Sequence, residues 1–183
     1  AKPTHDKINA DKIKSKTIIK FVPLLVKPSA GSISWFKIEN YLPSIVEEVA
    51  QNIVSSERAI IFGRRNAIVE LCAEVFYNKT NEIPTVVTGV KTRFPGKETL
   101  EKRRTSGKLF VFGNYSIELG VDLRKIPFGI IYGVYLGEVI QRLGRVGRGD
   151  VDLAQVIIPI PIGYANTLKY LIGKTGKEIS YEV

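Results

Sequence analysis

The feature that most constrains the fold of this sequence is a repeated alternation of short apolar runs with longer segments of helical periodicity. Residues 59–62 and 108–112 have the length and the β-branched or aromatic content of buried strands. Residues 39–54 instead carry apolar side chains at spacings of three and four, the stripe of an amphipathic helix. Strands that alternate with helices predict an α/β domain with a parallel sheet and helices on both faces.

The same pattern gives elements along most of the chain. A run at 17–26, interrupted by Pro23 and closed by Pro28, predicts a bent edge strand, because proline cannot donate to a sheet ladder. Residues 1–16 are charged and lack apolar periodicity, which predicts a flexible leader or linker before one domain over 17–183. The remaining expected strands are 85–88, 129–132 and 155–160, and the remaining helices are 66–77, 96–104, 137–145 and 164–172.

Composition narrows the possible functions. The formal net charge of +9 favours polyanions such as nucleic acid, although a basic protein without such a ligand would show the same excess. With Cys72 as the single cysteine and His5 as the single histidine, an intrachain disulfide, a thiolate metal cluster and a histidine-based catalytic dyad are excluded. The apolar runs are too short to span a bilayer, and no signal peptide is recognisable. We expect a cytoplasmic protein with no membrane partner.

The segment QRLGRVGR, residues 141–148, is the strongest candidate for chemistry. Its arginines stand three apart, interleaved with glycines, directly after an apolar turn of predicted helix. Such spacing places guanidinium groups along one side of a helix end, and glycine allows close approach. Arginine suits phosphate because its planar fork stays charged and binds in a bidentate manner. The alternative is a solvated basic helix end. The residues concerned are Arg142, Arg145 and Arg148, with Gly144 and Gly147.

This segment resembles motif VI of superfamily 2 helicases, Q-x-x-G-R-x-G-R. Residues 108–123, KLFVFGNYSIELGVDL, resemble motif V, and residues 58–76 resemble motif IV. The order of the three motifs, with strand and helix between each, carries the resemblance. It implies a RecA-like parallel sheet with helices on both faces, with residues 17–183 as the second, C-terminal lobe of a helicase.

Within that superfamily the string GNYSIELGVDL, followed by QRLGRVGR, is most similar to the CRISPR-associated type I helicases, which act on DNA beside a nuclease. Ski2-like and DEAH-type helicases also begin motif VI with glutamine, so these families stay open as alternatives. The sequence departs from motif V at Asn114, where the family commonly has threonine. Asparagine can still offer a hydrogen bond to a backbone phosphate.

The resemblance implies that ATP with Mg²⁺ binds between two RecA-like lobes. Motif VI would supply the arginine finger, which stabilises charge on the transferred phosphoryl group. Asp122 would contact the ribose or link motifs V and VI, although a turn or helix-capping carboxylate is the alternative. Arg142 would either contribute to this role or face solvent or the neighbouring lobe. The implied catalytic residues are Arg145 and Arg148, and the implied cofactor-binding residues are Gln141, Gly120 and Asp122.

The sequence contains no phosphate loop of its own. In the string Gly173-Lys174-Thr175, the glycine that a phosphate loop needs five positions earlier is replaced by Leu168. No Asp-Glu-x-His or Asp-Glu-x-Asp string is present either. A motor would therefore need a first RecA-like lobe, supplied in cis or in trans, and this chain should not hydrolyse ATP alone. The alternative is a non-catalytic nucleic-acid or partner-binding module that retains the fold.

Loops at the strand ends are expected to hold the nucleic acid through phosphates, which predicts binding that is independent of sequence and sensitive to salt. DNA is favoured over RNA, and a nuclease or a CRISPR effector complex is a possible further partner. For Arg64 and Arg65 the alternative is surface charge at a helix start, and the basic run 97–108 is better interpreted as a solvated helix face. The implied nucleic-acid-binding residues are Arg64, Arg65, Thr88, Asn114 and Ser116, with Lys91 and Arg93 nearby.

Overall fold

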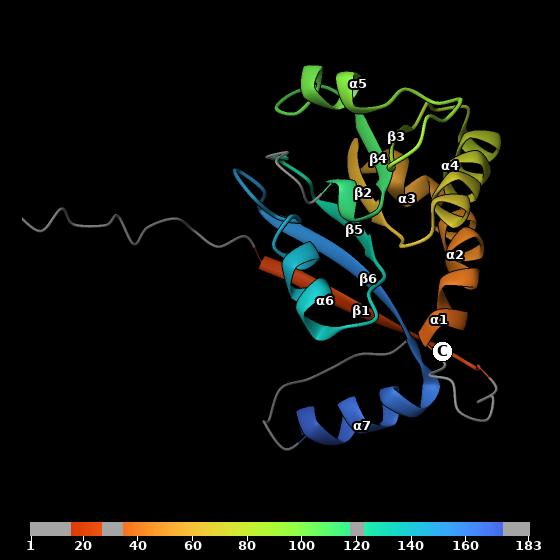
Figure 1. The fold of residues 1–183 in the computed structure, drawn as a ribbon. Helices are drawn as coiled ribbons and strands as arrows, with labels where there is room; N and C mark the ends of the chain where they lie inside the picture. The colour runs from red at the N-terminus through yellow and green to blue at the C-terminus, as the bar shows by residue number, and fades with distance from the viewer. Residues whose placement is uncertain (1–15, 27–34, 118–122, 174–183) are drawn as a thin grey trace, which may run out of the picture.

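The computed structural model describes residues 16–26, 35–117 and 123–173. Its strands form one six-stranded sheet with the order β1-β6-β5-β2-β4-β3, in which every neighbouring pair is parallel. This confirms the predicted parallel α/β architecture (Figure 1). The strands are β1 (Lys16–Leu24), β2 (Arg58–Phe62), β3 (Thr85–Val87), β4 (Leu109–Gly113), β5 (Phe128–Ile131) and β6 (Leu153–Pro161).

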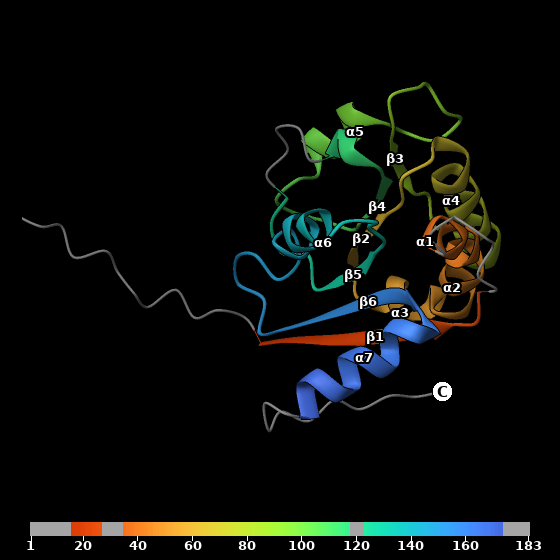
Figure 2. The same cartoon turned by 60° about the horizontal axis from the view of Figure 1, so that its bottom comes forward.

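Helices cover both faces of the sheet. On β2, Ala59 and Ile61 point into one buried cluster, whereas Ile60 and Phe62 point into the other. Figure 2 shows α1 to α4 on the first face and α6 on the opposite face. None of the helices in the described part of the chain has the length and apolar content needed to cross a bilayer. The helices are α1 (Trp35–Ile38), η1 (Glu39–Tyr41), α2 (Leu42–Glu48), α3 (Ala50–Ser55), α4 (Asn66–Thr80), α5 (Lys97–Lys102), η2 (Tyr115–Ile117), α6 (Leu136–Leu143) and α7 (Ile162–Gly173).

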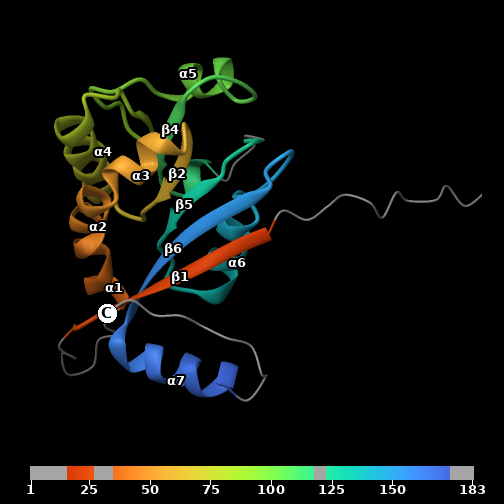
Figure 3. The same cartoon turned by 180° about the vertical axis from the view of Figure 1, so that it is seen from behind.

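Strand β1 lies at the edge of the sheet, as its proline predicted, and pairs along its length with β6 (Figure 3). Strand β6 is central but carries Pro159, which cannot donate a ladder hydrogen bond. The pairing of β6 with β5 ends at Ile157, so that beyond this residue only β1 lies beside it. The proline is thus placed where β6 has one neighbour.

Two differences from the predicted helix bounds bear on the candidate site. The single helix expected over 39–54 is divided into η1, α2 and α3. The break between α2 and α3 falls at Val49, which leaves the helical region with φ −102° and ψ 15°. Pro43 stands in the first turn of α2, where its missing N–H has no intrahelical acceptor to lose. The helix expected over 137–145 ends at Leu143. Arg145 therefore lies beyond the helix, in the connection to β6.

Candidate functional site

The motif VI segment is held against the amino end of β5. After α6 ends, the backbone N–H of Gly147 donates to the carbonyl oxygen of Ile126 at 2.8 Å. The backbone N–H of Lys125 donates in return to the carbonyl oxygen of Arg148 at 2.8 Å. Gly147 has φ 74°, a left-handed conformation that glycine adopts without steric strain. We call residues 144–149 the motif VI loop.

The side chains of this segment do not share one helix side. Arg145 is half-buried, and Arg148 and Gln141 are exposed. A Cβ atom placed on Gly144 would lie 3.7 Å from Nη2 of Arg148, so the Arg148 guanidinium folds back over the end of α6. Only Arg145 and Arg148, of the three arginines, project from the loop beyond the helix.

Arg142 is buried, with 2% of its surface exposed. Its Nη1 donates to the carbonyl oxygen of Tyr132, and its guanidinium carbon lies 5.2 Å from the centroid of the Phe62 ring. The expectation that Arg142 faces solvent or the neighbouring lobe is therefore wrong. Residue 142 lies on the face of α6 that packs on the sheet, where the buried carbonyl and the aromatic ring compensate the charge of the arginine.

The motif V residues Gly120 and Asp122, predicted to bind the nucleotide, lie outside the described residues. The chain re-enters the described part at Leu123, which is fully buried, as is Ile126. These two apolar side chains anchor the segment that precedes β5. The motif VI loop is hydrogen-bonded to this segment.

Arg58, at the amino end of β2, is a buried side chain that the motifs did not single out. It is 7% exposed, and its guanidinium donates to five backbone carbonyl oxygens at distances from 2.6 to 3.1 Å. Burial lowers the pKa of this guanidinium below its usual value. The bonds fix two segments that flank β2, one after α5 and one before β5. The acceptors are Arg103, Arg104, Gly107, Arg124 and Lys125.

At the carboxyl end of β4, Asn114 is 2% exposed and organises the turn that follows. Its Nδ2 donates to Oδ1 of Asn66 at 2.6 Å, and its Oδ1 accepts the backbone N–H of Ser116 at 2.9 Å. The structure thus places the Asn114 amide beneath the surface, where it positions Ser116, rather than at the surface where a phosphate would lie.

Thr88 and Ser116 line one cavity of about 530 Å³ at the carboxyl ends of β3 and β4. Lys91 and Lys97 line the same cavity and give it cationic walls. Arg93 instead pairs with Glu74, with 2.8 Å between Nη2 and Oε1. The structure therefore brings together Thr88, Ser116 and Lys91 of the predicted nucleic-acid residues.

The loop after β2 is fixed by Glu39, whose carboxylate is 1% exposed. Its Oε1 accepts the backbone N–H groups of Arg64 and Arg65 at 2.6 and 2.7 Å, and its Oε2 accepts Nε of Arg65 at 2.8 Å. The Arg65 side chain also donates to Oδ1 of Asn40. Arg65 is therefore engaged within the fold. Arg64 lies against Tyr135, with 5.9 Å from its guanidinium carbon to the ring centroid.

No sequence pattern indicated this use of Glu39, which was predicted only as the first residue of an amphipathic helix. Burial is the main cause that raises the pKa of both Cys72 and Tyr132, and the negative charge of Glu39 raises both further. The Glu39 carboxylate thus raises the pKa of two core groups and also holds the backbone of the loop after β2.

The basic run 97–108 is a solvated surface, as predicted. Lys102 pairs with Glu98 at 2.6 Å, and Lys108 pairs with Glu82 at 2.8 Å. These lysines are more than half exposed, and their ion pairs are of the kind that contributes little to stability.

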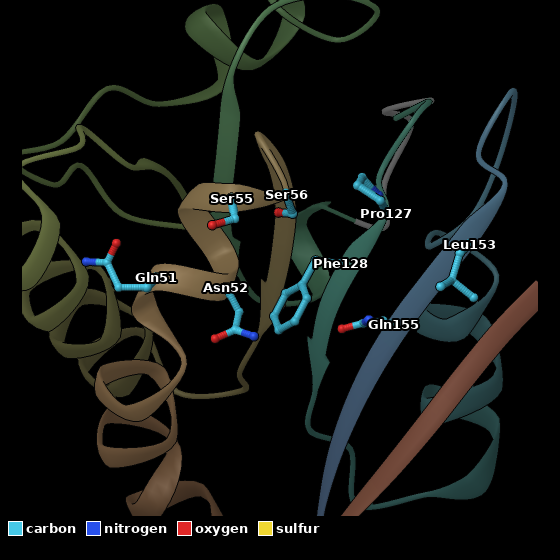
Figure 4. A pocket seen from close by; sticks show the side chains of 8 residues that line it. All are labelled: Gln51, Asn52, Ser55, Ser56, Pro127, Phe128, Leu153 and Gln155. Atoms are coloured by element: carbon cyan, nitrogen blue, oxygen red, sulfur yellow. The ribbon is translucent and has the colours of Figure 1, made fainter.

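A second cavity, of about 380 Å³, lies between the end of α3 and the amino ends of β5 and β6 (Figure 4). Asn52 and Gln155 offer amide groups on its two sides. It coincides with none of the predicted site residues. Its lining is uncharged and consists of Gln51, Asn52, Ser55, Ser56, Pro127, Phe128, Leu153 and Gln155.

The predicted residues therefore fall on two opposite sides of the sheet: the amino edge, formed by the amino ends of the strands, and the carboxyl edge, formed by their carboxyl ends. Arg145 and Arg148 follow α6 at the amino edge, beside the start of β5. Arg64, Thr88 and Ser116 lie at the carboxyl edge, after three strands that are neighbours in the order β2-β4-β3. One edge offers arginines on an anchored loop, and the other offers cationic and hydroxyl groups along a row of loops.

No family model matches the sequence, and no curated protein matches it. Several solved structures do match this chain. The chain is similar to domain 2 of the DEAD-box helicase Mss116p bound to an RNA duplex, with 15% identity and a TM-score of 0.60 over 91% of this chain and 62% of that one. The chain has the fold of a second RecA-like helicase domain.

Two further structures show the same fold. S. cerevisiae Dbp5, bound to RNA and ADP BeF3, matches 92% of this chain and 41% of its own, with 12% identity and a TM-score of 0.56. The DUF1998 helicase MrfA, bound to DNA and AMPPNP, matches 85% of this chain and 22% of its own, with 18% identity and a TM-score of 0.56. The chain thus spans less than two thirds of each of these three chains, and the similarity confirms the predicted fold class.

Proposed function

We propose that this chain is the C-terminal motor lobe of an ATP-dependent helicase or translocase. The observation that carries the proposal is the anchored motif VI loop. Hydrogen bonds to Ile126 and Lys125 fix its backbone, while Arg148 stays exposed at the sheet edge. A fixed backbone that presents an exposed arginine is what a charge-stabilising finger requires, because the donor is oriented before the reaction begins.

In this proposal Arg145 and Arg148 stabilise the charge that develops on the phosphoryl group of ATP during transfer. Gln141, exposed in the last turn of α6, senses the nucleotide, and Gly120 and Asp122 bind it from motif V. The phosphate loop and the carboxylates that hold Mg²⁺ come from a first RecA-like lobe, in cis or in trans. Arg142 has no role at the nucleotide in this proposal, since its charge is used inside the fold.

The opposite edge would carry the nucleic acid. Thr88, Ser116 and Lys91 share a cavity, and Arg64 follows the adjacent strand. Hydroxyl and cationic groups in such a row bind phosphates without reading bases. DNA as the ligand, and a role beside a nuclease in CRISPR interference, rest on the motif V and motif VI resemblance.

The test is ATP hydrolysis by the complex of this chain with its first lobe, with and without nucleic acid. The chain alone should not turn over ATP. In the complex, Arg148→Ala should lower kcat by about a thousandfold, as removal of an arginine finger does, and leave nucleic-acid affinity unchanged. Arg148→Lys, which keeps the charge without the planar fork, should recover only part of the rate.

Two results would contradict the proposal. Hydrolysis by the chain alone at the rate of the complex would show that no second lobe is needed. Unchanged hydrolysis by the Arg148→Ala complex would reduce the motif VI loop to surface charge and favour the non-catalytic module.

A further inference from the structure

Two tyrosines stand exposed where neighbouring loops leave the carboxyl edge of the sheet. Tyr115 follows β4 and is 58% exposed, and Tyr135 follows β5 and is 62% exposed. Exposed tyrosines also occur elsewhere in the described chain, but these two stand at the edge that carries the candidate phosphate-binding groups, where their rings can meet a bound ligand.

The sheet order sets the spacing between these tyrosines. β5 and β4 flank β2, so the loops of the two tyrosines are separated by two inter-strand spacings, which is roughly 10 Å. Between them, the loop after β2 carries Arg64. A chain of nucleotides that crosses the carboxyl edge of these three strands would thus pass one ring, one guanidinium and a second ring in turn.

Both rings stand on backbones that the fold holds in place. Ser116, next to Tyr115, donates its backbone N–H to Oδ1 of the buried Asn114 at 2.9 Å, and Ile117 after it is fully buried. Before Tyr135, the backbone N–H of Val134 donates to Oε2 of Glu138 at 2.9 Å. Preorganised aromatic groups lose little conformational entropy when a ligand binds.

The charge at this edge suits a polyanion. The Arg64 guanidinium carbon lies 5.9 Å from the centroid of the Tyr135 ring, within the range of a cation–π contact. Two acidic residues of the described chain at this edge are engaged by backbone amides: Glu39 accepts the amides of the loop after β2, and Glu138 accepts the amide of Val134. Cationic groups beside exposed rings are the combination that binds single-stranded nucleic acid, since phosphates pair with the charge and bases stack on the rings.

We propose that Tyr115 and Tyr135 are base-stacking positions for single-stranded nucleic acid at the carboxyl edge of the sheet. The inference rests on the proposed function and adds to it a preference for unpaired bases. Stacking accepts every base, because each has a π face, so the site holds a single strand without sequence specificity. A base pair in a duplex keeps its faces covered by its neighbours, and duplex should therefore bind more weakly than a single strand.

The experiment measures the anisotropy of a fluorescent oligothymidylate titrated with this chain. Tyr135→Ala and Tyr115→Ala should each weaken binding by about tenfold, and Tyr135→Phe should leave it unchanged because the ring persists. Tyr170→Ala, at a tyrosine of α7 that is 63% exposed, is the matched control and should have no effect. Circular dichroism of each variant checks that the fold is retained.

A second oligonucleotide with abasic sites in place of the thymines separates stacking from phosphate binding. The wild-type chain should bind it more weakly than either single variant binds oligothymidylate, and the variant with both Tyr115→Ala and Tyr135→Ala should no longer distinguish the two. If the wild-type chain binds both oligonucleotides equally, or if Tyr135→Ala binds oligothymidylate as the wild type does, the stacking site is overturned. If the wild-type chain binds neither, the proposed nucleic-acid function itself fails.

Discussion

The backbone N–H of Lys125 donates to the carbonyl oxygen of Arg148 at 2.8 Å, and this bond joins the finger candidate to the buried cation Arg58. The carbonyl oxygen of the same Lys125 accepts Nε of Arg58 at 3.1 Å. One residue thus connects the amino end of β2 with the motif VI loop. A loop whose arginine acts on a nucleotide needs such support, because a small displacement of a charge-stabilising donor removes much of its effect.

Replacing Arg58 should destabilise the protein strongly. Arg58→Ala leaves five carbonyl oxygens without this donor at a buried site, which should lower the free energy of unfolding by about 3 kcal/mol or more. Arg58→Lys, with three donors, should lie between the alanine variant and the wild type. Urea unfolding followed by circular dichroism gives the values. Arg104→Ala, at an exposed neighbour, is the control. An equal loss at both positions would show that the buried hydrogen bonds of Arg58 do not stabilise the protein.

Substitutions at Arg142 and Arg148, two arginines of the same motif, should differ in their effect on the free energy of unfolding. Arg142→Met keeps volume but removes the donor to Tyr132, and we expect a loss of about 2 kcal/mol in the free energy of unfolding. Arg148→Ala, at an exposed side chain, should change it by less than about 0.5 kcal/mol. Thermal and urea unfolding of the two variants measure the difference. Equal stability losses would contradict the division of the motif into a buried and an exposed arginine.

The layered fold was predictable because its strands are short apolar runs with clear limits. Residues 59–62 and 108–112 lie within one residue of β2 and β4. The division of 39–54 was not predictable, since Val49 continues the apolar stripe and only its backbone conformation ends α2. The strand order likewise depends on long-range pairing, which local periodicity does not contain.

The candidate site was predictable only where a motif marked it. The string QRLGRVGR indicated arginines for phosphate, but spacing alone could not tell that the first of them turns inward onto Phe62. Arg58 and Glu39 carried no signal, because their partners are backbone groups contributed by segments far away in the sequence. Charged residues that saturate backbone groups at a buried position are visible only once the chain is folded.

Gly113 should tolerate no side chain. A Cβ atom there would lie 2.5 Å from the carbonyl oxygen of Val87 and would also overlap the side chain of Ile117. The first contact is with backbone, so β3 and β4 would have to move apart, and Gly113→Ala should lose about 2 kcal/mol in the free energy of unfolding. Gly137, in the first turn of α6, meets nothing within 4 Å, and Gly137→Ala should gain up to about 0.5 kcal/mol. Urea unfolding of the two variants compares them, and a loss at both sites would refute the steric explanation.

The buried thiol of Cys72 should make the stability fall at alkaline pH. Burial, and then the charge of Glu39, raise the pKa of Cys72 above its usual value, so the folded protein keeps a proton that the unfolded chain releases above about pH 8.5. The unfolded state then binds fewer protons, and the free energy of unfolding decreases as pH rises, by up to about 1.4 kcal/mol per pH unit. Tyr132, whose pKa burial also raises, adds to this fall only above about pH 10.

Cys72→Ala isolates the contribution of the thiol. The variant leaves a small cavity, which lowers its stability by a similar amount at every pH, whereas the wild type loses stability through one more titrating group. The difference in free energy of unfolding between the two proteins should therefore shrink between about pH 7.5 and about pH 9.5. Urea unfolding across this range measures it, and the reaction of the native thiol with a disulfide reagent at pH 8 should be slow for the same reason. A difference that stays constant with pH would mean that Cys72 titrates alike in the folded and unfolded chains.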